Sequence, residues 1–351
     1  MVREAVLRGY VLEECLAWLL RGSGYRLLLS AADDPVELEA QGHELRVRGR
    51  GTSHQVDVLG ELAFTPAFSL PVRLFLEAKY YSTRCRLEVV RNAHGVVDDV
   101  NENFVARPGF HRPQRRFHYA YALFSASGFT AEAEQYALAH QISLVDISAP
   151  SFAWLREPIE RAAGRLYRRQ LRFGIGKFPI SWLRVRLRAL LGTVPVGELP
   201  EVETGAAQFA AAAELVLADL ADSLQTHQHT QLLLGFPAAP FILALSTQDK
   251  EAFRAFAAEH PSHAVRIRRT GGGSGEWLVS PLAEADAYQL AFTMPDQVER
   301  WITDSEEQRL ARTRRIKSEM LSAITIYDAG DDSDDHLVYR LRYEPGALRR
   351  E

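Results

Sequence analysis

The sequence predicts an α/β sandwich with a central mixed sheet, followed by an α+β C-terminal domain. Its 351 residues are 47% hydrophobic and 25% charged, an ordinary globular composition in a chain long enough for about two domains. Apolar residues first recur at helical spacing, and strand-like runs then alternate with helical patterns as far as Ile147. The composition becomes basic after Pro150, which separates this part from the remainder.

The first 150 residues divide into helices and strands by their apolar periodicity. Residues 4–20 form an amphipathic helix, because Val11, Cys15 and Leu19 share one face, and Gly22 ends it. Further helices are predicted over residues 88–104 and, with Thr130 as the cap, over residues 130–140. Strands or strand arms are predicted at residues 27–29, 36–47, 55–62, 72–79, 118–124 and 142–147. This order of elements is typical of a sheet sandwiched between helices.

Residues 151–200 are predicted to be a basic helical linker or a segment that contacts nucleic acid. They contain ten Lys or Arg and three Asp or Glu. Five of these basic residues fall on a helix that Pro158 could open: Arg161, Arg165, Arg168, Arg169 and Arg172. Contacts to a phosphate backbone need dispersed cations, so these arginines are candidate nucleic-acid contacts. A solvated helix face or a linker explains them equally well.

Residues 201–351 are predicted to be an α+β accessory domain of unknown role. Helices are expected at residues 206–224, 248–259 and 298–323, with strands at residues 232–234, 241–245, 324–326 and 337–343. A hairpin is expected over residues 265–279, around a glycine-rich tip. The aspartate run that begins at Asp328 is expected to be an exposed turn.

Bulk properties exclude some classes of protein. A net charge of −4 gives no global nucleic-acid signal, so such a partner would need a local basic surface. No apolar run of about 18 residues is present, and we therefore expect no membrane partner. Cys15 and Cys85 lack metal-type spacing and are expected to be reduced thiols of a cytoplasmic protein.

The chemically informative residues lie on two neighbouring predicted strands. Asp57 interrupts one apolar run, and Glu77-Ala78-Lys79 ends the next. The side-chain period of a strand is two, so Glu77 and Lys79 face the same side, where Asp57 can join them. Two carboxylates would then offer hard oxygen ligands to Mg²⁺. A structural ion pair at the strand ends is the alternative explanation.

Residues of about 4–148 resemble the PD-(D/E)xK nuclease superfamily, in particular its Mrr-like restriction endonuclease branch. The resemblance rests on the opening helix with Glu13-Glu14, on Asp57 with Glu77-Ala78-Lys79, and on the Gly128-Phe129-Thr130 block before a helix and a strand. It implies a restriction-endonuclease-like form of the sandwich. Mrr proteins often have Gln in place of Glu77, and the acidic residue here favours metal binding. The C-terminal half resembles no family.

The resemblance also implies roles for individual residues. Asp57, Glu77 and the Ala78 carbonyl would hold Mg²⁺, or Mn²⁺ in its place, and Lys79 would orient or help to deprotonate the attacking water. Glu13, favoured over Glu14 by its alignment on the helix, would bind a second metal ion or its water. Gln55 shares the strand face of Asp57 and would touch the nucleic acid.

The function expected from these residues is that of a Mg²⁺-dependent DNA endonuclease that hydrolyses phosphodiester bonds. By analogy with its relatives it would serve in restriction or antiviral defence, as a homodimer or as part of a larger defence complex. Two alternatives stay open. One is a non-catalytic nucleic-acid-binding or assembly module on a nuclease-like scaffold, and the other is an RNA-directed nuclease.

Overall fold

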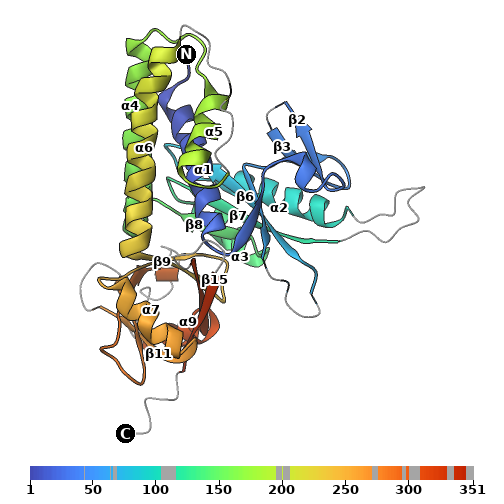
Figure 1. Ribbon diagram of the computed structural model, residues 1–351. Helices are drawn as coiled ribbons and strands as arrows, with labels where there is room; N and C mark the ends of the chain where they lie inside the picture. The colour runs from blue at the N-terminus through green and yellow to red at the C-terminus, as the bar shows by residue number, and fades with distance from the viewer. Residues whose placement is uncertain are drawn as a thin grey trace.

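The computed structural model describes the chain except residues 43, 64, 66–68, 104–115, 195–199, 201–205, 271–275, 295–297, 300–308, 330–335 and 345–351. The described residues form a five-stranded sheet with helices on both faces, a layer of long helices, a small three-stranded sheet and a closed β-barrel. Figure 1 shows the barrel below the long helices α4 (Ala153–Arg172) and α6 (Ala207–Thr230). The small sheet projects on the side of the molecule away from these helices. Within these residues, no helix is both long and apolar enough to span a bilayer.

The five-stranded sheet runs in the order β1-β5-β6-β7-β8. Its strands are β1 (Tyr25–Leu28), β5 (Val58–Leu62), β6 (Val72–Lys79), β7 (His118–Ser125) and β8 (Ser143–Asp146). β1, β5 and β6 pair antiparallel, whereas β6, β7 and β8 pair parallel. The predicted strand at residues 72–79 is confirmed, and the sheet is mixed.

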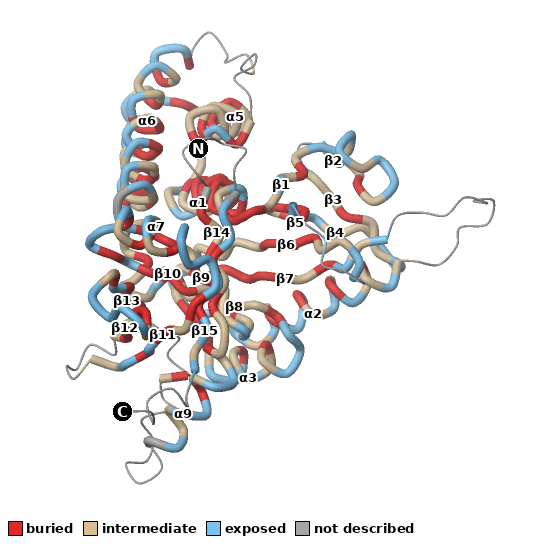
Figure 2. The backbone as a smooth tube through the Cα atoms, turned by 60° about the horizontal axis from the view of Figure 1, so that its bottom comes forward, coloured by how far each residue is buried: buried red, intermediate tan, exposed pale blue. Residues whose placement is uncertain are grey.

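Both faces of this sheet carry apolar side chains, and helices therefore cover both faces. α1 (Glu4–Arg21) packs on the face that carries Leu74 and Leu76. α2 (Leu87–Asn101) and α3 (Ala131–Ala139) cover the face that carries Phe75 and Leu123. Gly60 lets α1 approach closely, since a Cβ there would lie 2.7 Å from Cδ2 of Leu20. Figure 2 shows buried residues along β6 and β7 in the middle of the sheet.

A small sheet of β2 (Leu38–Gln41), β3 (Glu44–Arg48) and β4 (Ser53–Gln55) follows a 3-10 turn, η1 (Ala31–Asp33). The single strand predicted over residues 55–62 is wrong, because β4 and β5 are separate strands in different sheets. Asp57 lies in the bend between them, immediately before β5. The chain changes sheets at this point, which an apolar pattern alone does not reveal.

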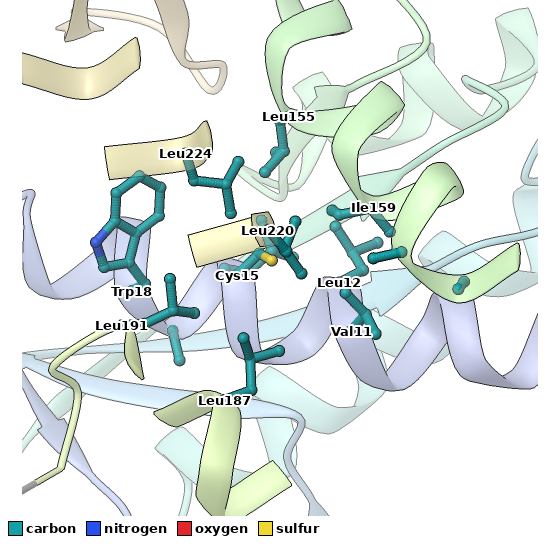
Figure 3. Packing of buried hydrophobic residues seen from close by; sticks show 14 of the residues in the cluster. Val11, Leu12, Cys15, Trp18, Leu155, Ile159, Leu187, Leu191, Leu220 and Leu224 are labelled. Carbon is teal, nitrogen blue, oxygen red and sulfur yellow. The ribbon is translucent and has the colours of Figure 1, made fainter. Parts of the chain in front are cut away.

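The segment after β8 folds into long helices that pack on α1. After a 3-10 turn, η2 (Pro150–Phe152), come α4 (Ala153–Arg172), α5 (Ile180–Leu190) and α6 (Ala207–Thr230). Figure 3 shows Cys15 of α1 among leucine and isoleucine side chains of all three helices. The expectation that Pro158 opens a helix is wrong. It is buried inside α4, which begins earlier because Leu155 and Ile159 share its buried face.

The C-terminal part is a closed seven-stranded barrel of order β10-β13-β12-β11-β15-β14-β9. Its strands are β9 (Leu232–Pro237), β10 (Leu243–Ser246), β11 (Ser262–Arg269), β12 (Glu276–Pro281), β13 (Leu290–Thr293), β14 (Ala323–Ala329) and β15 (His336–Tyr343), with helices α7 (Lys250–Glu259) and α9 (Arg309–Glu319). Gly235 stands where β9 pairs with both β10 and β14. A Cβ at this position would lie within 3 Å of side chains from both neighbouring strands.

This barrel overturns the predicted fold class. The chain has a closed β-barrel and is not the predicted restriction-endonuclease-like α/β/α sandwich followed by an α+β domain, although its mixed α and β character agrees with the prediction. Two pairings that join distant segments close the barrel, β9 with β14 and the parallel pair β11 with β15. Residues 290–293, which form β13, were not predicted as a strand.

Candidate functional site

Asp57 and the end of β6 are joined by a hydrogen bond. The backbone N–H of Ala78 donates to Oδ2 of Asp57 over 2.9 Å. Val58 pairs with Leu76 in the antiparallel register, so Asp57, one residue earlier, comes beside Glu77. The structure therefore brings Asp57, Glu77 and Lys79 together. What it shows of Ala78 is an N–H contact, whereas the sequence had suggested a role for its carbonyl.

Glu77 is held from two sides. One of its carboxylate oxygens forms an ion pair with the Lys79 ammonium, and the other accepts a hydrogen bond from the Tyr121 hydroxyl. The side chains of Lys79 and Glu77 are about one-fifth exposed, so solvent and ligands can reach them. Burial alone would lower the pKa of Lys79, but the ion pair with Glu77 outweighs it and the pKa is raised. Lys79 is therefore protonated near neutral pH.

Glu13 of α1 approaches Asp57 from the helical side. Burial raises the pKa of Glu13 to about 8, and the negative charge of Asp57 adds to this effect. The pKa of Asp57 is also raised, because burial together with the charge of Glu77 outweighs the hydrogen bond from Ala78. Asp57 thus interacts electrostatically with a carboxylate on each side. Like charges gathered in this way favour a proton or a cation between them.

A polar cavity of about 70 Å³ opens beside these residues. Its polar lining consists of Glu13, Glu14, Glu44, Gln55, Asp57, Arg184 and Arg188. The volume is enough for a few water molecules. Gln55 therefore shares the cavity with Asp57, whereas Glu77 and Lys79 are outside its lining.

Asp57 and its acidic neighbours are the oxygen donors that a divalent cation would meet here. Within the described part of the chain, no group of three or more His, Cys, Asp or Glu side chains is placed to hold a metal ion. Mg²⁺ is commonly bound through one or two carboxylates and retains several waters, whereas a structural Zn²⁺ site needs four protein ligands. Asp57 with Glu13 or Glu77 meets the first requirement.

The five arginines predicted to contact nucleic acid lie on α4 and do not line the cavity. Arg165 is paired with Asp219 of α6 at 2.6 Å, and Arg161 with Glu157 at 3.6 Å. Burial, reinforced by Arg165, lowers the pKa of Arg169. The structure thus places Arg165 beside α6, and none of the five arginines lines the cavity that Gln55 and Asp57 share.

Sequence reasoning missed Arg184 and Arg188, which reach the cavity from α5. Their spacing of four places them on one helix face, although in the sequence they alternate with apolar residues and Arg186 lies between them. The residue in the sequence that could have indicated these two arginines is Glu14. This acid lies on the apolar face of α1, and a buried carboxylate requires a cationic partner.

Comparisons with known proteins leave the identity of the chain open. No family model and no curated protein matches it. A solved structure described as "Crystal Structure of Protein of Unknown Function AF1548" is 15% identical and aligns over 61% of this chain and 99% of that chain, with a TM-score of 0.28. A similarity this weak supports no argument about the fold or the function of this chain.

Proposed function

We propose that this protein is a metal-dependent phosphodiesterase that cleaves nucleic acid, with DNA as its substrate. The observation that carries the proposal is the hydrogen bond between Asp57 and Ala78, which joins a separate carboxylate to the Glu-x-Lys end of β6. Asp57 also lines a polar cavity of about 70 Å³ beside this contact. The likeness of these residues to the PD-(D/E)xK motif supports the same proposal, and a role in restriction or antiviral defence rests on that likeness alone.

Asp57 with Glu13 or Glu77 would hold Mg²⁺ or Mn²⁺. When bound, such an ion supplies a Lewis acid that activates water and offsets the charge developing on the phosphate. Lys79 is protonated, so it acts by donating hydrogen bonds and positive charge rather than as the base. Tyr121 fixes the orientation of Glu77 through its hydroxyl.

A non-catalytic nucleic-acid-binding scaffold is the second candidate. It is favoured by the contacts that Lys79 and Arg184 make with Glu77 and Glu13, because these contacts already engage both of the carboxylates that flank Asp57. An RNA-directed nuclease would use the same residues as a DNA nuclease, so only a comparison of substrates separates those two.

The test is a cleavage assay of the full chain on plasmid DNA, single-stranded DNA and RNA, with Mg²⁺ or Mn²⁺ against EDTA. We expect metal-dependent cleavage of DNA that Asp57→Ala and Lys79→Ala abolish. Cleavage that both variants retain would contradict the site. Binding without cleavage of any of the three substrates would favour the scaffold, and a preference for RNA would favour the RNA-directed nuclease.

A further inference from the structure

Glu14 of α1 is a fully buried carboxylate shared by two guanidinium groups. Its side chain is 1% exposed, and its oxygens accept from Nε of Arg184 and from Nε of Arg188, each over 2.6 Å. A second nitrogen of Arg188 also donates to it over 3.0 Å. The two arginines thus bring one positive charge more than Glu14 can neutralise.

Arg184 directs the rest of its guanidinium toward the candidate site. One terminal nitrogen lies 2.9 Å from the Glu13 carboxylate, and the side chain is 24% exposed. Arg184 lines the same cavity as Asp57 and Gln55. Because Glu14 fixes Nε of the guanidinium, the two terminal nitrogens are oriented before any ligand arrives.

We propose that Arg184 binds the phosphate of the nucleic-acid substrate in this cavity, with Glu14 as the residue that positions it. This inference rests on the proposed function, because a metal ion that engages Glu13 would release the Arg184 nitrogen now paired with it. The planar guanidinium fork then matches two phosphate oxygens. α5, which follows the predicted nuclease segment in sequence, thereby supplies part of the site.

Arg186 on the same helix is a matched control. It forms an ion pair of the same kind, with Glu214 of α6, and does not line the cavity. If Arg184 only holds α5 against α1, Arg184→Gln and Arg186→Gln should have similar effects on stability and on substrate binding. If Arg184 contacts the phosphate, only Arg184→Gln should weaken substrate binding.

The experiment measures binding of a fluorescein-labelled, cleavage-resistant phosphorothioate DNA oligonucleotide to the full chain in Mn²⁺ across a salt series, and then the cleavage kinetics of unmodified DNA in Mn²⁺. For Arg184→Gln we expect Kd to rise about tenfold and the salt slope to fall by about one. Arg186→Gln should stay within about twofold of wild type. Arg184→Lys should keep the salt slope but bind more weakly, because an ammonium lacks the fork.

Oligonucleotide affinity of Arg184→Gln equal to that of Arg186→Gln would overturn the inference. If thermal melting shows that Arg184→Gln does not fold, the affinity of Arg184→Lys tests the inference instead. Wild-type affinity in Arg184→Lys would then overturn the inference. If the wild-type protein binds DNA but does not cleave it, the proposed function fails. The role of Arg184 is then judged on the binding measurements alone.

Discussion

The backbone N–H of Ala78 donates a 2.9 Å hydrogen bond to the carboxylate of Asp57. This contact joins the bend before β5 to the end of β6, and it places the Asp57 carboxylate beside the Glu77–Lys79 ion pair. Glu13 of α1 and Arg184 of α5 complete the polar surroundings. The candidate site is therefore assembled from the sheet, from α1, which packs on the sheet, and from α5, which packs on α1.

Tyr121→Phe tests whether the orientation of Glu77 matters. The substitution removes the hydroxyl that donates to Glu77 but keeps the ring, which stacks on Phe75 with centroids 4.9 Å apart. We expect cleavage activity to fall about tenfold and unfolding free energy to fall by about 1 kcal/mol. Tyr136→Phe, which removes a hydroxyl bonded to His94, is the control. Equal activity in the two variants would show that Tyr121 has no role at the site.

Glu13 should give the metal-free protein a pH-dependent stability. Its pKa is raised in the folded state from 4.5 to about 8, so between these values the folded chain holds a proton that the unfolded chain has lost. Folding stability must then decrease as the pH rises through this window. Urea unfolding in EDTA at pH 5, 6.5 and 8 should show a shallower decrease for Glu13→Gln than for wild type.

Glu102→Gln is the control for this pH series, because it removes an exposed carboxylate paired with Arg50. Its stability should follow the wild-type pH dependence. Identical slopes for wild type and Glu13→Gln would show that the folded state does not raise the pKa of Glu13.

Asp328→Asn should destabilise the barrel. Asp328 is 4% exposed and accepts from Arg254 over 2.6 Å, and its carboxylate lies 3.3 Å from the ammonium of Lys250, itself 5% exposed. Removing the charge leaves a buried ammonium without its carboxylate, which costs about 3 kcal/mol. Chemical denaturation should report this loss, and the exposed Asp286→Asn should show almost none. A loss below about 1 kcal/mol would mean that the pair contributes little.

Local sequence patterns predicted the helices, strands and caps that depend on residues close together in the chain. The apolar face of α1 and the eight residues of β6 were predicted closely, and Thr130 caps α3 as expected, accepting from the N–H of Ala133. Strand parity also brought Glu77 and Lys79 to one side. These features depend on neighbours within a few positions, which a sequence displays directly.

Features that depend on distant partners could not be predicted in the same way. Glu14 is paired with Arg184, 170 positions later, and β11 pairs in parallel with β15, which begins beyond the acidic run. Asp328 reads as the start of an exposed acidic turn, yet Arg254 and Lys250 of α7 bury it, and residues 331–335 of that run lie outside the described residues. Such pairings become visible only once the chain is folded.

The central claim is that Asp57 is part of a metal-dependent cleavage site. The measurement that tests it most directly is the cleavage rate of labelled DNA in Mn²⁺ and in EDTA, for wild type, Asp57→Asn and Asp99→Asn. Asp99 also accepts a backbone N–H, that of Gly51 at 2.8 Å, but it does not line the cavity. We predict that Asp57→Asn lowers the Mn²⁺-dependent rate at least about a hundredfold, while Asp99→Asn stays within a few-fold of wild type. Equal rates in the two variants, or a wild-type rate that EDTA leaves unchanged, would contradict it.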